Sequence, residues 1–117
     1  MASKRIEMYT QKQYELEEMK DRLQMAFGKH KLLDMELKAE IFRELGETKT
    51  LLLVYENWFF RTGSYASLLI LLSEFRGYQS ADVMATGGKE NFCSWGAEAD
   101  FVEVGEKALE NLGFRGK

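Results

Sequence analysis

Proline is absent from the 117-residue chain, and cysteine and histidine occur once each, as Cys93 and His30. A single cysteine excludes an internal disulfide and is typical of a reducing compartment. The longest apolar run, Leu68 to Leu72, has the length of a strand, far short of the ~20 residues that a membrane-spanning helix needs. The first residues, MASKRIEMYTQ, lack the apolar stretch of a signal peptide. We therefore expect a cytoplasmic protein without a membrane segment.

The chain also has little excess of charge of either sign. The chain has 16 basic and 19 acidic residues, a net charge of -3 at pH 7, and 45% hydrophobic residues. This balance is typical of a globular domain and gives no reason to expect nucleic acid or an acidic membrane surface as the main partner. No repeat, low-complexity stretch or linker interrupts the chain. We predict a single domain over residues 1–117.

Residue sets that would carry catalysis or hold a metal are missing. His30 stands among lysines after a glycine, as a solvated loop residue does. Cys93 has no second cysteine or histidine beside it, which argues against a nucleophile or a zinc site. Gly87-Gly88-Lys89 lacks the full phosphate-loop pattern, and the acidic start of the following helix would repel a phosphate. We interpret that stretch as a strand-to-strand corner and expect no catalytic residue, metal or cofactor; the sequence favours a protein that is not an enzyme.

Apolar residues at helical spacing predict two helices. The first begins at Thr10, as the N-cap of a capping box with Gln13, and ends at Gly28 as a left-handed cap. The second runs from about 97 to 112, with Gly113 at the C′ position of a Schellman cap. The residues that we expect to face a sheet are Leu16, Met19, Leu23, Ala26, Phe27, Phe101, Gly105, Ala108, Leu109 and Leu112.

Strand patterns occupy most of the remaining chain. From Thr48 onward alternation predicts an antiparallel meander, whose strands cover 48–61, 64–75 and 78–86 and are joined by the turns Thr62-Gly63 and Arg76-Gly77. Residues 32–45 alternate like a strand but also fit helical i,i+4 spacing, and we favour the strand. Two shorter strand candidates are residues 4–9 and 91–94.

These elements predict an α+β domain in the order β-α-β4-α. It is a two-layer structure, with two helices on one face of an antiparallel sheet, of the kind seen in TATA-box-binding-protein-like or helix-grip folds. One sheet face is almost entirely apolar and should take the helices. Leu51, Leu53 and Leu68 belong to this apolar face. Leu52 and Leu69 fall on the other face, which mixes aromatic and polar residues.

The mixed face is the candidate site. Two-residue turns would set Phe60 opposite Tyr65 and Phe75 opposite Tyr78. A large apolar surface with a polar rim marks a partner interface or a ligand groove, although a terminal segment covering it is an alternative. The residues that we assign to a ligand or interface site are Glu56, Trp58, Phe60, Tyr65, Phe75, Tyr78 and Asp82.

Glu56 and Asp82 raise the idea of paired carboxylates on this face. In the predicted register they are two strands and one pleat step apart, roughly 11 Å between backbones. No sugar-specific or metal-binding pattern accompanies them. We interpret them as exposed or interface carboxylates.

A resemblance covers about residues 48 to 114. The chain resembles a family of small bacterial cytoplasmic proteins of unknown function. It departs from the family pattern at Tyr65, where a basic residue is usual, and at Lys89, where a third glycine is usual. The family implies a bacterial cytoplasmic origin but no catalytic role. The stretches that carry the resemblance are Val54-Tyr55-Glu56, Arg61, Gly63-Ser64, Ala66-Ser67-Leu68, Thr86-Gly87-Gly88, Phe92, Ser94-Trp95-Gly96-Ala97-Glu98 and Gly113-Phe114.

The sequence therefore favours a non-enzymatic interaction module that self-associates, as a homodimer, through the mixed sheet face. An alternative is a binder of a small apolar ligand on the same face, with Glu56, Asp82 or Arg61 as polar anchors. An enzyme ranks third, because no pair of a nucleophile and a base is visible.

Overall fold

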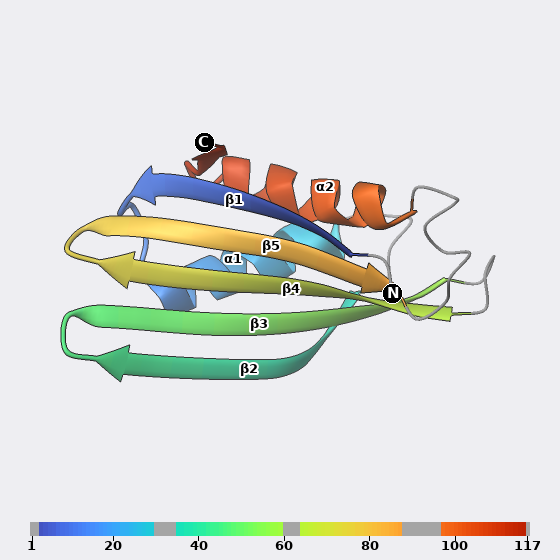
Figure 1. Ribbon diagram of the computed structural model, residues 1–117, viewed down its shortest axis with the longest axis horizontal. Coiled ribbons are helices and arrows are strands. Elements are labelled where there is room, and N and C mark those ends of the chain that lie inside the picture. Colours follow the sequence, from blue (N-terminus) through green and yellow to red (C-terminus); the bar gives the residue numbers. More distant parts are fainter. Residues whose placement is uncertain (1–2, 30–34, 60–63, 88–96, 117) are drawn as a thin grey trace.

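The computed structural model describes residues 3–29, 35–59, 64–87 and 97–116, which form six strands and two helices (Figure 1). The predicted strand at 91–94, Cys93, His30 and Phe60 lie outside these residues. The elements in chain order are β1 (Ser3–Gln11), α1 (Leu16–Gly28), β2 (Met35–Leu45), β3 (Thr48–Phe59), β4 (Ser64–Phe75), β5 (Tyr78–Gly87), α2 (Ala97–Glu110) and β6 (Arg115–Gly116).

The strands form one antiparallel sheet in the order β2-β3-β4-β5-β1-β6. Strands β2 to β5 form a meander, and β1 joins it beside β5. The α+β antiparallel sheet agrees with the prediction. The element order does not, because the two-residue strand β6 follows α2 and pairs with Met8 and Tyr9 of β1.

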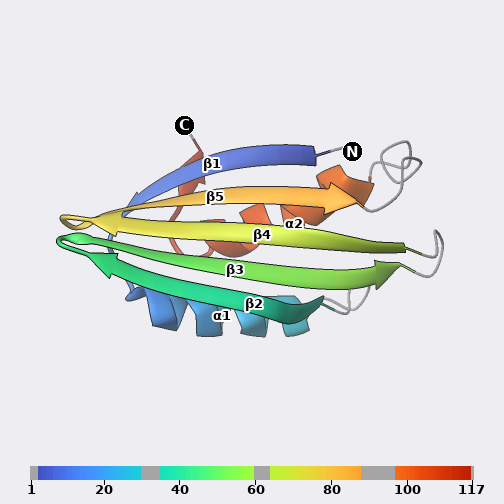
Figure 2. The same cartoon turned by 60° about the horizontal axis from the view of Figure 1, so that its bottom comes forward.

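Both helices lie on the same side of the sheet, as Figures 1 and 2 show. Helix α2 packs over β4, β5 and β1, whereas α1 packs over β3 and against α2. Gly105 brings α2 close to the strands, since a Cβ there would lie 3.1 Å from Val83 Cγ1. The largest side chains buried in this layer are Tyr55, Phe101, Phe114, Met8, Met19, Leu23, Leu51, Leu53, Leu68, Ile70 and Leu72.

Helix α1 starts later than the capping-box pattern predicts. Thr10 is not an N-cap; it belongs to β1, which runs on to Gln11 because both residues pair with the start of β5. The N-cap is Glu15, which makes no capping hydrogen bond through its side chain within the described chain. Gly28 is the last helical residue rather than a left-handed cap, and Lys29 after it has a φ of -86°. Pairing in the sheet thus overrides a local capping signal.

The end of α2 agrees with the predicted Schellman cap. Gly113 has a φ of +99°. Its N–H donates to the Glu110 carbonyl at 3.0 Å, and the Phe114 N–H donates to the Leu109 carbonyl at 3.1 Å. These are the two hydrogen bonds that define the motif. Phe114 is fully buried beneath the helix end.

Residues 35–45 form a strand, as favoured, with a bulge at Lys38 between Leu37 and Ala39. The β4–β5 register also agrees, since Phe75 lies opposite Tyr78 across a turn with φ of 50° at Arg76 and 82° at Gly77.

The predicted β3–β4 register is wrong. Tyr65 pairs with Trp58 instead of Phe60, because β3 ends at Phe59 and β4 begins at Ser64, so the connection is longer than two residues. The error is a shift of two residues along the strands. Side chains alternate with a period of two, so the assignment of residues to faces survives this shift.

Candidate interaction surface

The sheet face opposite the helices carries every second residue of five strands, and we call it the open face. In Figures 1 and 2 neither α1 nor α2 covers it. Cross-strand partners point to the same side of a sheet, so the pairing defines its members. The members whose side chains are described include Arg5, Glu7, Tyr9 and Gln11 of β1, Glu36, Ala39, Ile41 and Arg43 of β2, Thr50, Leu52, Val54 and Glu56 of β3, Ser67, Leu69, Leu71, Ser73 and Phe75 of β4, and Tyr78, Ser80, Asp82, Met84 and Thr86 of β5.

An apolar band crosses the middle of the open face. Two adjacent rows of cross-strand partners form it, and Ile41 at its β2 end is 49% exposed. The side chains in the centre of the band are half-buried by their neighbours, with no helix above them in the described chain. The rows are Ile41, Leu52 and Leu71, and Ala39, Val54, Leu69 and Met84.

Polar rows border the band on both sides. One row contains Thr50, Ser73 and Ser80, and the other contains Glu56, Ser67 and Thr86. An apolar surface enclosed by hydroxyl and carboxyl groups has the composition of a protein interface core with its rim.

A closed group of charges ends the band on β1 and β5. Glu7 and Asp82 are direct cross-strand partners. Arg5 joins them, with its Nη2 2.7 Å from Asp82 Oδ1 and 2.6 Å from Glu7 Oε1. The Tyr9 hydroxyl donates to Glu7 Oε2 at 2.8 Å. The hydrogen bond to Asp82, followed by the charge of Glu7, raises the pKa of Arg5, and the hydrogen bond to Glu7 raises the pKa of Tyr9. Arg5 therefore balances one of the two negative charges, and each carboxylate has at least one partner inside the chain.

The structure separates the two carboxylates that the sequence placed near each other. Glu56 pairs with Ser67, whereas Asp82 pairs with Leu71, four residues further along β4. Two strand spacings and two pleat steps put their backbones roughly 17 Å apart. The predicted separation of one pleat step was wrong because the β3–β4 register is shifted by two residues.

The predicted aromatic residues form two groups rather than one cluster. Phe75 and Tyr78 are neighbours at one end of the sheet and are 48% and 65% exposed. Trp58 and Tyr65 are partners near the other end, ten residues away along β4. The centre between them is the aliphatic band. The contribution of β1 to this face was not predicted, although Arg5, Glu7 and Tyr9 alternate with the apolar residues at 6 and 8.

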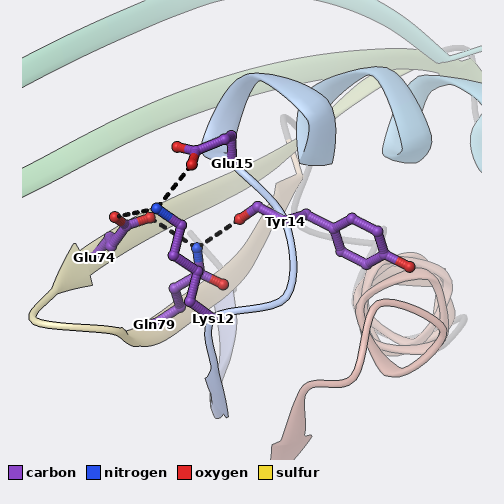
Figure 3. A network of polar contacts seen from close by, with 5 residues as sticks. All are labelled: Lys12, Tyr14, Glu15, Glu74 and Gln79. Atoms are coloured by element: carbon purple, nitrogen blue, oxygen red, sulfur yellow. Dashed lines mark hydrogen bonds and ion pairs between the residues drawn. The ribbon is translucent and has the colours of Figure 1, made fainter.

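A polar network centred on the buried side chains of Glu74 and Gln79 lies on the opposite, helix-bearing side (Figure 3). Glu74 is 7% exposed and accepts from Lys12 Nζ at 3.0 Å and from Gln79 Nε2 at 2.9 Å. Lys12 Nζ also lies 2.9 Å from Glu15 Oε1, and Gln79 Nε2 also donates to the Tyr14 carbonyl at 2.9 Å. Hydrogen bonds to Glu15 and then Glu74 raise the pKa of Lys12, and Lys12 lowers the pKa of Glu15. The network ties the segment before α1 to the β4–β5 hairpin, which is a structural role.

A hollow of about 350 Å³ lies between the two helices, on the other side of the sheet from the open face. Its lining combines apolar and charged side chains from the C-terminal part of α1 and from α2. The lining residues are Ala26, Phe27, Glu103, Val104, Lys107, Ala108 and Asn111.

The described ranges contain neither a cluster of metal-ligating side chains nor a membrane-spanning helix. No group of three or more His, Cys, Asp or Glu side chains there is placed to hold a metal ion. Of the helices in these ranges, none is both long enough and apolar enough to cross a bilayer.

The chain matches one known protein family over most of its length. The model of the family of unknown function DUF6054 matches residues 1–113. The match includes the N-terminal third, beyond the stretch that carries the resemblance in the sequence. The chain therefore belongs to this family. No curated protein matches the chain.

Proposed function

We propose that this DUF6054 protein is a non-enzymatic interaction module that self-associates through its open face. The observation that carries the proposal is the apolar band, which spans four strands between two polar rows with no helix above it in the described chain. Removing such a surface from water is favourable by about 25 cal/mol per Å².

The dimensions of the open face suit a dimer. Five strands span four spacings of ~4.8 Å, and β3 and β4 have 12 residues each, at ~3.4 Å per residue. The product is on the order of 800 Å², which is the area that each partner contributes to a standard-size interface. A second copy packed face to face would cover the band and leave the Arg5 charge group at its rim.

Binding of a small apolar ligand on the same face is less well supported. Of the polar anchors expected for it, Asp82 is already paired with Arg5, and Arg61 lies outside the described residues. A ligand site also encloses most of its ligand, whereas α1 and α2 both lie on the far side of the sheet.

Two finer assignments belong to this proposal. A cytoplasmic setting is supported by the single cysteine, which is typical of a reducing compartment, and a bacterial origin is what the family resemblance implies. The likeness to TATA-box-binding-protein-like or helix-grip folds is supported by an antiparallel sheet with both helices on one face. A topology of this kind hosts unrelated functions, so the likeness adds no chemistry.

The test removes apolar surface from the centre of the band. Val54 and Leu69 are direct partners and half-buried, so the double variant V54T/L69Q makes the band polar without introducing charge. We expect it to halve the mass measured by light scattering after size-exclusion chromatography. The matched control is Met25→Gln, which removes an apolar side chain that is 63% exposed on α1 and should keep the wild-type mass.

An unchanged mass for V54T/L69Q, with a native circular dichroism spectrum, would refute association through the open face. Native mass spectrometry of the wild type distinguishes self-association from binding of a small apolar ligand. A monomer that carries a discrete additional mass, lost in V54T/L69Q, would identify a ligand-binding face instead.

A further inference from the structure

We propose that the outer edge of β2 is a second self-association site, where the β2 strands of two copies pair antiparallel about a two-fold axis at Ile41. This interface uses the backbone edge of β2 instead of the surface of the sheet, shares Ile41 with the open face, and extends the sheet from one copy into the next. It rests on the exposure and charge pattern of β2 alone.

Strand β2 is the uncovered edge of the sheet. It is the outermost strand, and within the described chain it pairs with β3 only. The opposite edge differs, because β6 pairs with part of β1 there. An edge strand presents unpaired N–H and C=O groups that can accept another strand. Eleven residues of such an edge are available in β2.

The distal half of β2 is also exposed on both faces. Ile41 is 49% exposed on the open face, and Phe42, its neighbour on the helix-bearing face, is 47% exposed. Leu45 at the strand end is 74% exposed. Helix α1 reaches this strand through the ion pair of Lys20 with Glu40, 2.8 Å apart, yet leaves Phe42 uncovered. Large apolar side chains on an unpaired edge favour a partner strand.

The bulge limits where a partner can pair. Bulges and charges are the usual means of protecting a sheet edge. Here the bulge lies at Lys38, and the ion pair of Lys38 with Glu36 adds charge at the same end. The regular segment beyond it runs from Ala39 to Leu45, which contains all three exposed apolar side chains.

Charge selects one register for pairing two copies of this segment. Residues that are opposed across the two β2 strands must point to the same face of the joined sheet. This holds only when the two-fold axis lies where a residue is opposed to the same residue of the other copy. An axis at Ile41 sets Ile41 against itself, Glu40 against Phe42 and Ala39 against Arg43. No like charges are opposed in this register.

Neighbouring registers oppose like charges, which destabilises an antiparallel pair. An axis at Phe42 sets Glu40 against Glu44 twice, and an axis at Glu40, Arg43 or Glu44 sets a charge against itself. Axes nearer the strand ends meet the bulge or pair too few residues. In the Ile41 register the two Phe42 rings are diagonal neighbours, a distance that aromatic side chains can bridge.

The experiment uses opposite charges at the proposed axis. Ile41→Lys and Ile41→Glu are prepared separately in the V54T/L69Q background, which isolates the edge from the open face. Each variant alone sets like charges against each other and should halve the mass of its parent in light scattering. An equimolar mixture sets Lys against Glu and should restore the parent mass.

Native mass spectrometry with one variant labelled with ¹⁵N should then show a mixed dimer. A single chain carries either Lys or Glu at position 41, never both. Restoration of the parent mass in the mixture therefore reports contact between two copies at this position and not a change within one chain. The matched control is the pair Met25→Lys and Met25→Glu, at an exposed side chain of α1, where neither variant nor their mixture should change the mass.

The outcomes separate the two proposals. If I41K in the wild-type background keeps the wild-type mass, or if the mixture fails to restore it, edge pairing is refuted whatever happens at the open face. If V54T/L69Q keeps the wild-type mass, and in that background I41K halves the mass and the mixture with I41E restores it, the open face is refuted and edge pairing stands.

Discussion

Tyr55→Phe should stabilise the protein, although it removes a polar group from the middle of the core. Tyr55 is 2% exposed on the helix-bearing face of β3. Its ring meets Phe27 of α1 edge-on, with centroids 4.9 Å apart and an interplanar angle of 80°. The hydroxyl is buried and has no hydrogen-bond partner in the described part of the chain. Burial, with a smaller contribution from the charge of Glu40, raises the pKa of this hydroxyl.

The size of the effect follows from these contacts. A buried hydroxyl that loses its bonds to water and gains none costs about 1–3 kcal/mol. Phenylalanine keeps the ring and its edge-on contact with Phe27. We expect a gain of about 1 kcal/mol in the free energy of unfolding, or roughly 4 °C in Tm for a domain of this size.

Urea denaturation followed by circular dichroism measures this difference, and an unchanged m value would show that the two folds match. Tyr78→Phe is the control, with both substitutions made in the V54T/L69Q background, because Tyr78 is 65% exposed in a single copy of the chain and its hydroxyl is then hydrated in both states. Its effect should stay within about 0.5 kcal/mol. A Tyr55→Phe variant less stable than wild type would mean that the hydroxyl makes a stabilising bond, and the reasoning would be wrong.

Two further predictions concern the chain around the helix ends. Lys12 lowers the pKa of Glu15, so the folded protein favours the Glu15 carboxylate. This stabilisation is present above pH 4.5, the ordinary pKa of the group, and is lost as the pH falls through its lower pKa in the folded protein. Glu15→Gln should therefore flatten the Tm profile below pH 4.5, and parallel profiles would contradict the interaction. Gly113→Ala should cost about 1–2 kcal/mol, because Gly113 has a φ of +99° and a Cβ there would lie 2.8 Å from Gln13 Nε2. Gly116→Ala, with open space around it, is the control in urea denaturation, and equal stabilities would argue against strain at Gly113.

The spacing of apolar residues, with the period of two of a strand or the 3.6-residue period of a helix, predicted most of the architecture. Alternation in β3, β4 and β5 was sufficient to assign Leu51, Leu53 and Leu68 to the core and Leu52 and Leu69 to the open face. This assignment survived an incorrect register, because a slip of two residues keeps each side chain on its face. The Gly113 cap was also predictable, since a Schellman motif depends on a few consecutive residues.

Local signals failed where distant segments compete for the same residues. Thr10 and Gln13 carry a capping pattern, but Thr10 and Gln11 pair with β5, nearly seventy residues later. Glu74 and Gln79 fall in strand patterns, and nothing in those patterns predicts that Glu74 accepts a hydrogen bond from Lys12, 62 residues earlier in the chain. No periodicity within either segment reports such a pairing.

The sequence by itself determined which residues face the helices and which face away, because the period of a strand or helix is a property of the local backbone. Only the tertiary structure decided that β1 joins the sheet beside β5 and that β2 is left as an edge. It also decided that Glu56 and Asp82 lie far apart. Strand order and register depend on pairing energies between segments distant in the chain, and a sequence pattern does not contain them.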